Sequence, residues 1–112
     1  MQPGSIVVLH LVDPSEKYFG VMLQLGGAGV TVRAINMSSL DDWMRSLSYD
    51  EEPAFGPATI FFPLRRVERM ALDEPSGQVE SLGQMIERRV DQSIRELLGL
   101  APVEPAETET TH

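Results

Sequence analysis

The stretch Ala58–Leu72, with the sequence ATIFFPLRRVERMAL, decides the predicted fold because it contains two short strands joined by a tight bend. The strands are the apolar run TIFF and the later run VERMAL. Pro63 follows the first run, and its fixed φ and missing N–H interrupt strand pairing there. The bend carries Arg65 and Arg66 side by side in a chain that is acidic overall. We expect this stretch to close a small barrel and to present the two arginines.

The size and composition of the chain indicate one acidic domain without a membrane segment. The 112 residues suit a single domain, and 42% of them are hydrophobic, which is enough for one modest core. The absence of cysteine excludes disulfides and thiolate metal sites and fits a reducing cytoplasm. Met1–Gly4 lacks the pattern of a signal peptide, and no apolar run approaches the ~20 residues of a membrane span. A net charge of −8 disfavours non-specific attraction to nucleic acid or anionic membranes. We therefore expect a cytoplasmic protein.

Two strands are predicted before the glycine-rich loop. Ser5–Val12 (SIVVLHLV) is almost wholly apolar and β-branched, which indicates a strand covered on both faces. His10 is expected to be a hydrogen-bonded core or interface residue because no partner base, nucleophile or second ligand accompanies it. Lys17–Leu25 is the second strand, in which Gly20 marks a bulge, a sharp bend or a close backbone approach.

The loop Gly26–Gly29 (GGAG) is predicted to be a hairpin connection that tolerates positive φ. A phosphate-cradling loop would lead into a helix N-terminus and would usually carry a lysine. Here the loop leads instead into a third strand, Val30–Ile35 (VTVRAI). The glycines therefore favour a turn over a nucleotide site.

A helix is predicted at Ser38–Ser48, between the third and fourth strands. Ser39 and Asp42 resemble a capping box at its start. Trp43 is expected to form a lid on the barrel core rather than a stacking platform for a base. The helix has one apolar stripe at i, i+3, i+4 and i+7, formed by Leu40, Trp43, Met44 and Leu47.

The loop Tyr49–Pro57 follows this helix and carries three acids, Asp50, Glu51 and Glu52. Together with two aspartates of the helix they form an acidic cluster. The cluster lacks the alternating spacing and the glycine turn of a calcium-binding loop. We expect a solvated loop and carboxylates that complement the helix dipole, with no bound metal.

A second amphipathic helix is predicted over Val79–Leu98, after the boundary Asp73–Gly77 (DEPSG). Its apolar residues step by threes and fours and make one stripe. Ser81 with Gln84 fits a capping box, and Gly99 is a plausible stop. The stripe is longer than a small barrel requires for itself, so part of it is expected to meet another subunit.

The predicted organisation is a small barrel over residues 1–75 with the inserted helix 38–48, a helical segment over 76–100 and a tail over 101–112. The tail contains Pro, Glu and Thr without apolar periodicity, which predicts an acidic, disordered segment. Truncation after Leu100 is expected to leave the fold and the assembly intact.

The succession of strand sequences resembles the Sm-like fold, the small barrel shared by LSm proteins and the bacterial RNA chaperone Hfq. The similarity covers about Gly4–Leu72, from IVVLHL through EKYFGVMLQL, the glycine loop and VTVRAI to TIFFPLRRVERM. It implies a five-stranded barrel assembled into a ring, with the fourth and fifth strands as subunit edges. RNA would then bind at the loop after the second strand and at the bend before the fifth.

This resemblance implies two sets of site residues. The ligand or RNA candidates are Arg65, Arg66, Gly26 and Gly27. The oligomer interface candidates are Ile60, Phe62, Val67 and Met70. The glycine loop lacks the Asp and Asn residues that hold a base in RNA-binding members. The fold is also similar to that of the stringent-starvation-type protease adaptors, which hold peptides on the same kind of barrel.

We expect a non-enzymatic, homo-oligomeric binding or assembly module with a protein or peptide partner and no cofactor or metal. Catalysis needs a matched pair or triad of groups in a cleft, and the sequence nominates none. The alternative is an RNA-binding ring that uses the bend at Arg65 and Arg66. A further alternative is that each arginine pairs with a carboxylate of a neighbouring subunit.

Overall fold

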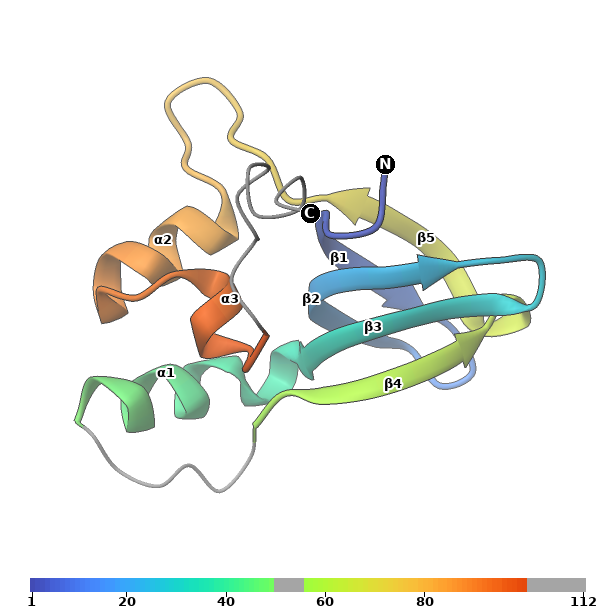
Figure 1. The fold of residues 1–112 in the computed structure, drawn as a ribbon, viewed down its shortest axis with the longest axis horizontal. Helices are drawn as coiled ribbons and strands as arrows, with labels where there is room; N and C mark the ends of the chain where they lie inside the picture. Colours follow the sequence, from blue (N-terminus) through green and yellow to red (C-terminus); the bar gives the residue numbers. More distant parts are fainter. Residues whose placement is uncertain (50–55, 101–112) are drawn as a thin grey trace, which may run out of the picture.

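The computed structural model describes residues 1–49 and 56–100, which form a five-stranded sheet with helices at one end (Figure 1). The strands are β1 (Ile6–Leu11), β2 (Glu16–Leu25), β3 (Gly29–Asn36), β4 (Ala58–Pro63) and β5 (Val67–Leu72). The helices are α1 (Leu40–Ser48), α2 (Leu82–Val90) and α3 (Ile94–Leu97), with two 3-10 turns, η1 (Met37–Ser39) and η2 (Leu64–Arg66). The predicted mostly-β architecture, with a helix between the third and fourth strands, is confirmed. Two predictions fall outside the described residues: the solvated acids Asp50, Glu51 and Glu52 of the loop, and the disordered tail 101–112.

The sheet is antiparallel throughout and has the strand order β4-β3-β2-β1-β5. β4 pairs with β3 and β5 pairs with β1, so the fourth and fifth strands are the two edges. These edges do not pair with each other in the described part of the chain, and the sheet is not closed into a barrel. Pro63 and the η2 turn separate them, as expected from a residue without an N–H.

Gly20 marks the tightest backbone approach inside the sheet. It lies opposite Val7 on β1 and Ala34 on β3. A Cβ at Gly20 would collide with the carbonyl oxygen of Arg33 and would lie 2.5 Å from the Cα of Ala34. The predicted close approach is therefore confirmed, whereas the register shift in β2 falls between Met22 and Gln24, not at Gly20.

Substitution of Gly20 by alanine is predicted to destabilise the protein by about 2–3 kcal/mol because the backbone of β3 must move away. Gly27→Ala is the matched control, since a Cβ there meets nothing within 4 Å. Urea unfolding of both variants should show a lower midpoint for Gly20→Ala alone. Equal midpoints would show that the sheet does not depend on this approach.

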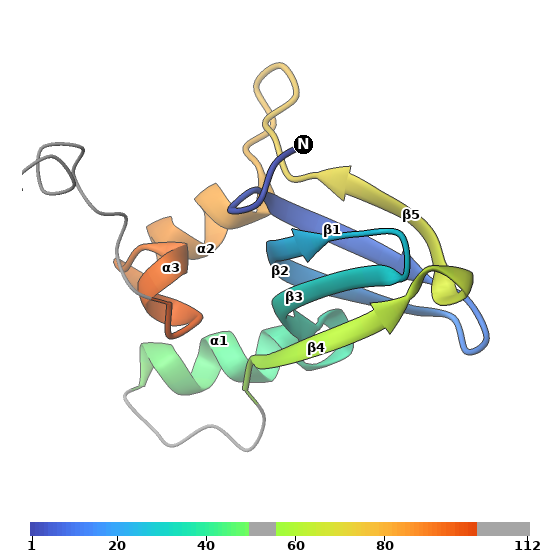
Figure 2. The ribbon, with the colours of Figure 1, turned by 45° about the vertical axis from the view of Figure 1, so that its right-hand side comes forward.

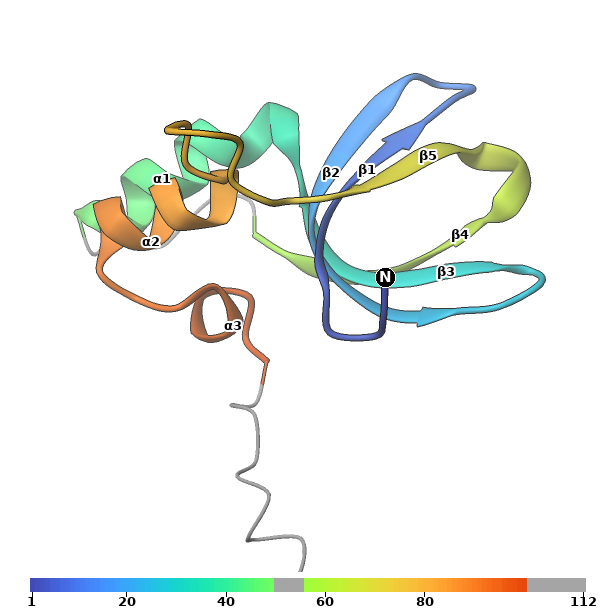
Figure 3. The same cartoon turned by 90° about the horizontal axis from the view of Figure 1, so that it is seen from above.

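The sheet buries side chains on both faces, in two separate clusters. The inner cluster lies within the curl of the sheet and contains Val7, Leu9, Leu11, Met22, Val30, Val32, Ala34 and Phe62. The outer cluster joins the other face to the helices and contains Phe19, Val21, Ile35, Leu40, Trp43, Met44, Ile86, Ile94, Leu97 and Leu98. Figure 3 shows the helices outside the curl. Alternate residues of β1 serve the two clusters, which confirms the prediction that both faces of this strand are covered as far as Val8.

The predicted helix Ser38–Ser48 is present, but its first turn is the 3-10 turn η1. The capping box expected from Ser39 is wrong, because the Ser39 side chain makes no cap hydrogen bond. Asn36 takes this role one turn earlier by accepting a hydrogen bond from the Ser38 N–H at 2.9 Å. Trp43 is only 2% exposed and belongs to the outer cluster, so it packs between helix and sheet and is not a lid on the inner core.

The single helix predicted over Val79–Leu98 is wrong. The chain forms α2 with the expected capping box of Ser81, and then breaks at Asp91, whose φ is 63°. Ser93 starts α3 with a second capping box. The break turns the second half of the apolar stripe back onto the sheet, where it joins the outer cluster. Gly99 ends the helical segment at a φ of 76°, as predicted.

Two polar side chains fasten the helices to the sheet. Asp73, directly after β5, accepts hydrogen bonds from the N–H groups of Leu82 and Gly83 at 2.8 and 2.7 Å. These donors lie in the first turn of α2, where a helix has no internal acceptor for them. At the other end, Arg33 of β3 donates from Nε to the carbonyl of Leu98 at 2.7 Å. The helical segment is thus tied to strands at both of its ends.

Asp73→Ala is expected to lower the free energy of unfolding by about 1–2 kcal/mol because it leaves two helix N–H groups without their acceptor. Glu74→Ala removes an exposed neighbouring acid and serves as the control. Chemical unfolding monitored by Trp43 fluorescence measures both, because Trp43 lies in the cluster that the helices complete. A loss of equal size in the two variants would contradict the capping role of Asp73.

Candidate functional site

The predicted ligand segments meet at one end of the sheet. The Gly26 N–H bonds to the carbonyl of Gly29 at 3.0 Å and closes the β2–β3 hairpin. The Leu64 N–H then bonds to the carbonyl of Ala28 at 3.1 Å and joins this hairpin to the η2 bend. Figure 2 shows the hairpin tip beside the turn between β4 and β5. The structure therefore brings the glycine loop and the arginine bend together.

The glycines of the hairpin contribute backbone and no charge. Gly26 and Gly27 are exposed, and neither has a positive φ. Gly29 is needed for a different reason, because the ring of Phe61 lies over it. A Cβ at Gly29 would lie 2.6 Å from Cζ of Phe61. Gly29 thus leaves room for the backbone carbonyl of Phe62 and for the ring of Phe61.

Arg66 is bound within its own chain. Its Nε donates to the carbonyl of Val12 at 2.7 Å, and a terminal nitrogen donates to the carbonyl of Pro14 at 3.1 Å. The same nitrogen pairs with Oε1 of Glu16 at 3.0 Å. The guanidinium also lies 5.9 Å from the ring centre of Phe62. Arg66 therefore holds the β1–β2 turn against the bend and has few donors left for a ligand.

Arg65 differs from its neighbour. Its side chain is exposed and has no hydrogen bond or ion pair with the residues that the structure describes. The predicted pair of functional arginines is thus divided into a structural residue and a free cation. Nothing in the sequence indicated this division, because both arginines occupy the same bend, which contains no acid.

The four predicted interface residues belong to the inner cluster or pack against it. Phe62 is 6% exposed, and its ring centre lies 5.1 Å from that of Tyr18. Ile60, Val67 and Met70 are partly buried against the same cluster. β4 and β5 therefore extend one apolar interior to both open edges of the sheet.

Three large apolar side chains that the sequence did not single out are exposed near this end. Leu25 at the end of β2 is 52% exposed, Phe61 on β4 is 54% exposed and Leu64 in η2 is 43% exposed. Their exposure could have been anticipated only from the register, which turns Phe61 away from the inner cluster that Phe62 joins.

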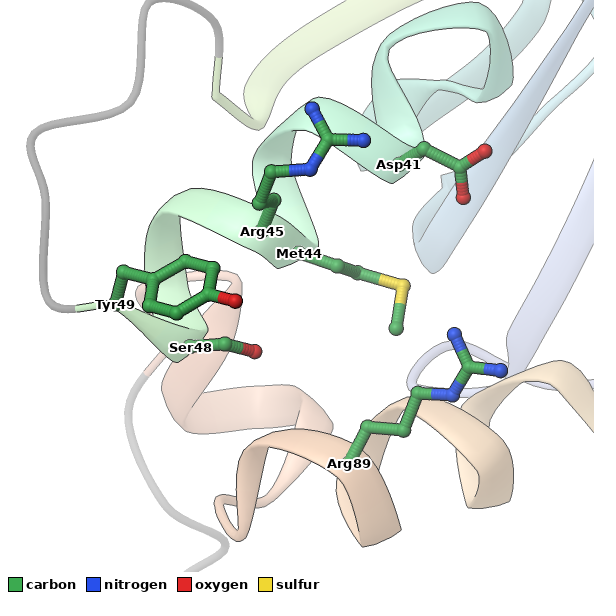
Figure 4. Close-up of a pocket in the computed structure, with 6 residues that line it drawn as sticks. All are labelled: Asp41, Met44, Arg45, Ser48, Tyr49 and Arg89. Carbon is green, nitrogen blue, oxygen red and sulfur yellow. The ribbon is translucent and has the colours of Figure 1, made fainter.

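A shallow hollow of about 270 Å³ lies between α1 and α2 (Figure 4). It is lined by Asp41, Met44, Arg45, Ser48, Tyr49 and Arg89. Arg45 is paired with Asp42 at 3.2 Å. Arg89 forms no hydrogen bond or ion pair within residues 1–49 and 56–100, and its charge contributes to the lowered pKa of the Glu80 carboxyl. The lining contains no histidine or cysteine that would act as a general base or nucleophile beside Ser48.

His10 lies at the edge of the covered part of β1. Its side chain is partly exposed, and its ring makes no hydrogen bond to the described residues. A hydrogen-bonded position in the core is therefore not observed, and the interface position stays a prediction. Among these residues no group of three or more His, Cys, Asp or Glu side chains is arranged to hold a metal. Likewise, no helix in the described ranges is both long and apolar enough to cross a membrane.

Comparison of the chain with protein-family models, curated proteins and solved structures finds no significant match. The Sm-like resemblance therefore stays a prediction from the strand sequences. The open edges of the sheet are the structural feature that bears on function.

Arg66→Ala is predicted to lower the free energy of unfolding by about 1–2 kcal/mol, because it removes charge-assisted hydrogen bonds to two carbonyls of the β1–β2 turn. The adjacent Arg65→Ala is the matched control and should stay within ~0.5 kcal/mol of the parent protein. Urea unfolding measures both. Equal losses, or none in either variant, would show that Arg66 does not secure the turn.

Proposed function

We propose that this chain is a non-enzymatic assembly module of the Sm-like type, in which the open edges of the sheet pair with further copies of the chain. The observation that carries the proposal is the composition of β4. This edge strand, ATIFFP, has six residues and no charge. Natural edge strands are usually protected by lysine, by inward-pointing charges or by a covering element. Within residues 1–49 and 56–100, β4 has none of these apart from Pro63 at its end, and its Phe61 is exposed.

The strand order supports the same proposal. The Sm-like resemblance implies that the fourth and fifth strands are the subunit edges, and β4 and β5 lie at the two edges of this sheet. Pairing of β4 with β5 of the next copy is a head-to-tail contact, which closes into a ring when the rotation permits. Such pairing would also cover the ends of the inner cluster, which Ile60 and Met70 leave partly exposed.

The RNA-binding alternative has weaker support. It needs two basic side chains at the bend, and Arg66 is engaged with Val12, Pro14 and Glu16. The neighbouring hairpin supplies no charge. The exposed apolar residues at the same end favour a protein surface over a phosphate backbone, because phosphate binding depends on Lys and Arg.

Light scattering of the purified chain at micromolar concentration tests the proposal and should give a mass several times that of one chain. Phe61→Lys places a charge on the open edge and is expected to reduce the mass to that of a monomer. Val79→Lys is the matched control, because Val79 is 70% exposed and lies outside the sheet. A monomeric parent protein, or equal dissociation of both variants, would contradict edge pairing.

A further inference from the structure

A row of basic side chains crosses three strands on the outer face of the sheet. His10 of β1 lies directly opposite Lys17 of β2 and directly opposite Arg69 of β5. Residues directly opposite each other share a face of the sheet. Leu9 and Leu11, on either side of His10, belong to the inner cluster, so His10 and its two partners face outward. We call Lys17, His10 and Arg69 the basic row.

The basic row lies just past the layer of helices. Val8, the preceding outward residue of β1, packs against the outer cluster beneath the helices. His10 is two residues further along and is partly exposed, while Lys17 and Arg69 are exposed. Figure 3 shows that the helices cover one end of the sheet and leave the other end open. The row therefore lies on the part of the outer face that the helices leave accessible.

The row lacks the internal partners that most other basic residues have. Arg33, Arg45, Arg66, Arg88 and Arg95 each have a partner in the chain. Arg88, for example, is held by Glu80, and this contact lowers the pKa of the Glu80 carboxyl. Lys17 and Arg69 have no hydrogen bond or ion pair to any described residue. Two unpaired cations thus flank a histidine in a chain with a net charge of −8.

This arrangement disfavours a charged His10 in the isolated fold. A protonated His10 would lie directly opposite two cations, and like charges directly opposite each other destabilise a sheet. The pKa of His10 is lowered by partial burial first and then by Arg69 and Lys17, while Glu68 acts in the opposite direction. Glu68 is the residue that the register shift between β1 and β5 leaves unpaired beside Arg69. Among the described residues, one acid therefore lies beside the three basic groups, which leaves room for carboxylates of a partner.

The spacing of the row indicates the form of the ligand. Neighbouring strands lie about 4.8 Å apart, so the row spans about 9.6 Å from Lys17 to Arg69. Seven residues of an α-helix rise about 10.5 Å, and residues at i and i+4 have Cβ atoms about 5–6 Å apart. In an extended peptide, side chains on one face are separated by about 6.6 Å or more, which matches the row less well.

We propose that the basic row binds an acidic helix of a partner protein, with carboxylates at i, i+4 and i+7 facing Lys17, His10 and Arg69. His10 takes up a proton as the carboxylates approach, because its charged form is then paired. This partner site lies on the face of the sheet and is separate from the edge pairing proposed above.

Fluorescence anisotropy with a labelled helical peptide carrying Glu at i, i+4 and i+7 tests the proposal. A second peptide of the same composition, with its Glu residues distributed around the helix, should bind more weakly. Lys17→Gln/Arg69→Gln is expected to weaken the binding of the first peptide by about tenfold, a loss of about 1.4 kcal/mol in binding free energy. Arg65→Gln/Arg89→Gln removes the same charge from two other unpaired arginines and should leave the affinity within about twofold. Glu68→Gln should tighten binding.

The pH dependence provides a readout that a structural role would not produce. The affinity for the Glu peptide should rise as the pH falls from 7.5 towards the lowered pKa of His10, since proton uptake accompanies binding in that range. His10→Gln should remove this dependence. The Lys17→Gln/Arg69→Gln protein should fold about as stably as the parent, because neither side chain has a hydrogen bond or ion pair to a described residue.

Three results would overturn the proposal. One is equal weakening by the two double variants, which would mean non-specific attraction. Another is equal affinity for the two peptides, which would show that the helical spacing of the carboxylates does not determine binding. The third is tighter binding of a single-stranded oligonucleotide or of inorganic polyphosphate through the same residues, which would assign the row to a phosphate polymer.

Discussion

The close approach of β2 and β3 at Gly20 is the constraint on which the rest of the structure depends. Gly20 faces Ala34 across the ladder, and the two smallest side chains of the inner face meet there. The absence of a Cβ at Gly20 lets β2 and β3 approach closely, and the inner faces of β4 and β5 contribute to the same interior. The curl also leaves the opposite face convex, where α1, α2 and α3 pack. Both clusters thus pack against the strands that meet at this close approach.

Polar contacts then fasten the parts that the curl brings together. Arg66 holds the β1–β2 turn to the bend before β5 through two backbone carbonyls. Asp73 and Arg33 hold the two ends of the helical segment to the strands. Each contact joins a charged side chain to backbone groups that lack a partner in regular structure, which is the situation in which such hydrogen bonds contribute most. These charged side chains therefore stabilise the connections between strands and helices.

The strands were predictable because each is a short apolar run bounded by glycine, proline or aspartate. The helix break was not, because the residues before and after Asp91 continue one apolar period. Only the left-handed conformation of Asp91 and the second cap at Ser93 end it. For the same reason part of that stripe was expected to meet another subunit, whereas α3 returns its second half to the same sheet. Local periodicity does not show where a chain reverses.

The candidate site was less predictable than the fold, because partners distant in sequence decide what a charged residue does. Arg65 and Arg66 are adjacent, yet their roles differ since only Arg66 reaches Val12 and Glu16. His10, Lys17 and Arg69 are dispersed in the sequence, and only the register places them in one row. Charges that are adjacent in the sequence are easily noticed, whereas charges that strand pairing brings together are not apparent from the sequence.

The two proposals meet at β5, because Arg69 belongs both to the open edge and to the basic row. Pairing of β5 with β4 of another copy would place a strand beside Arg69. β4 carries no acid, so this added strand would bring no carboxylate to neutralise the row. Assembly would therefore leave each row unpaired and repeat it once for every copy. Several rows on one assembly would bind an acidic partner with several helices far more tightly than a single row does, through their high local concentration.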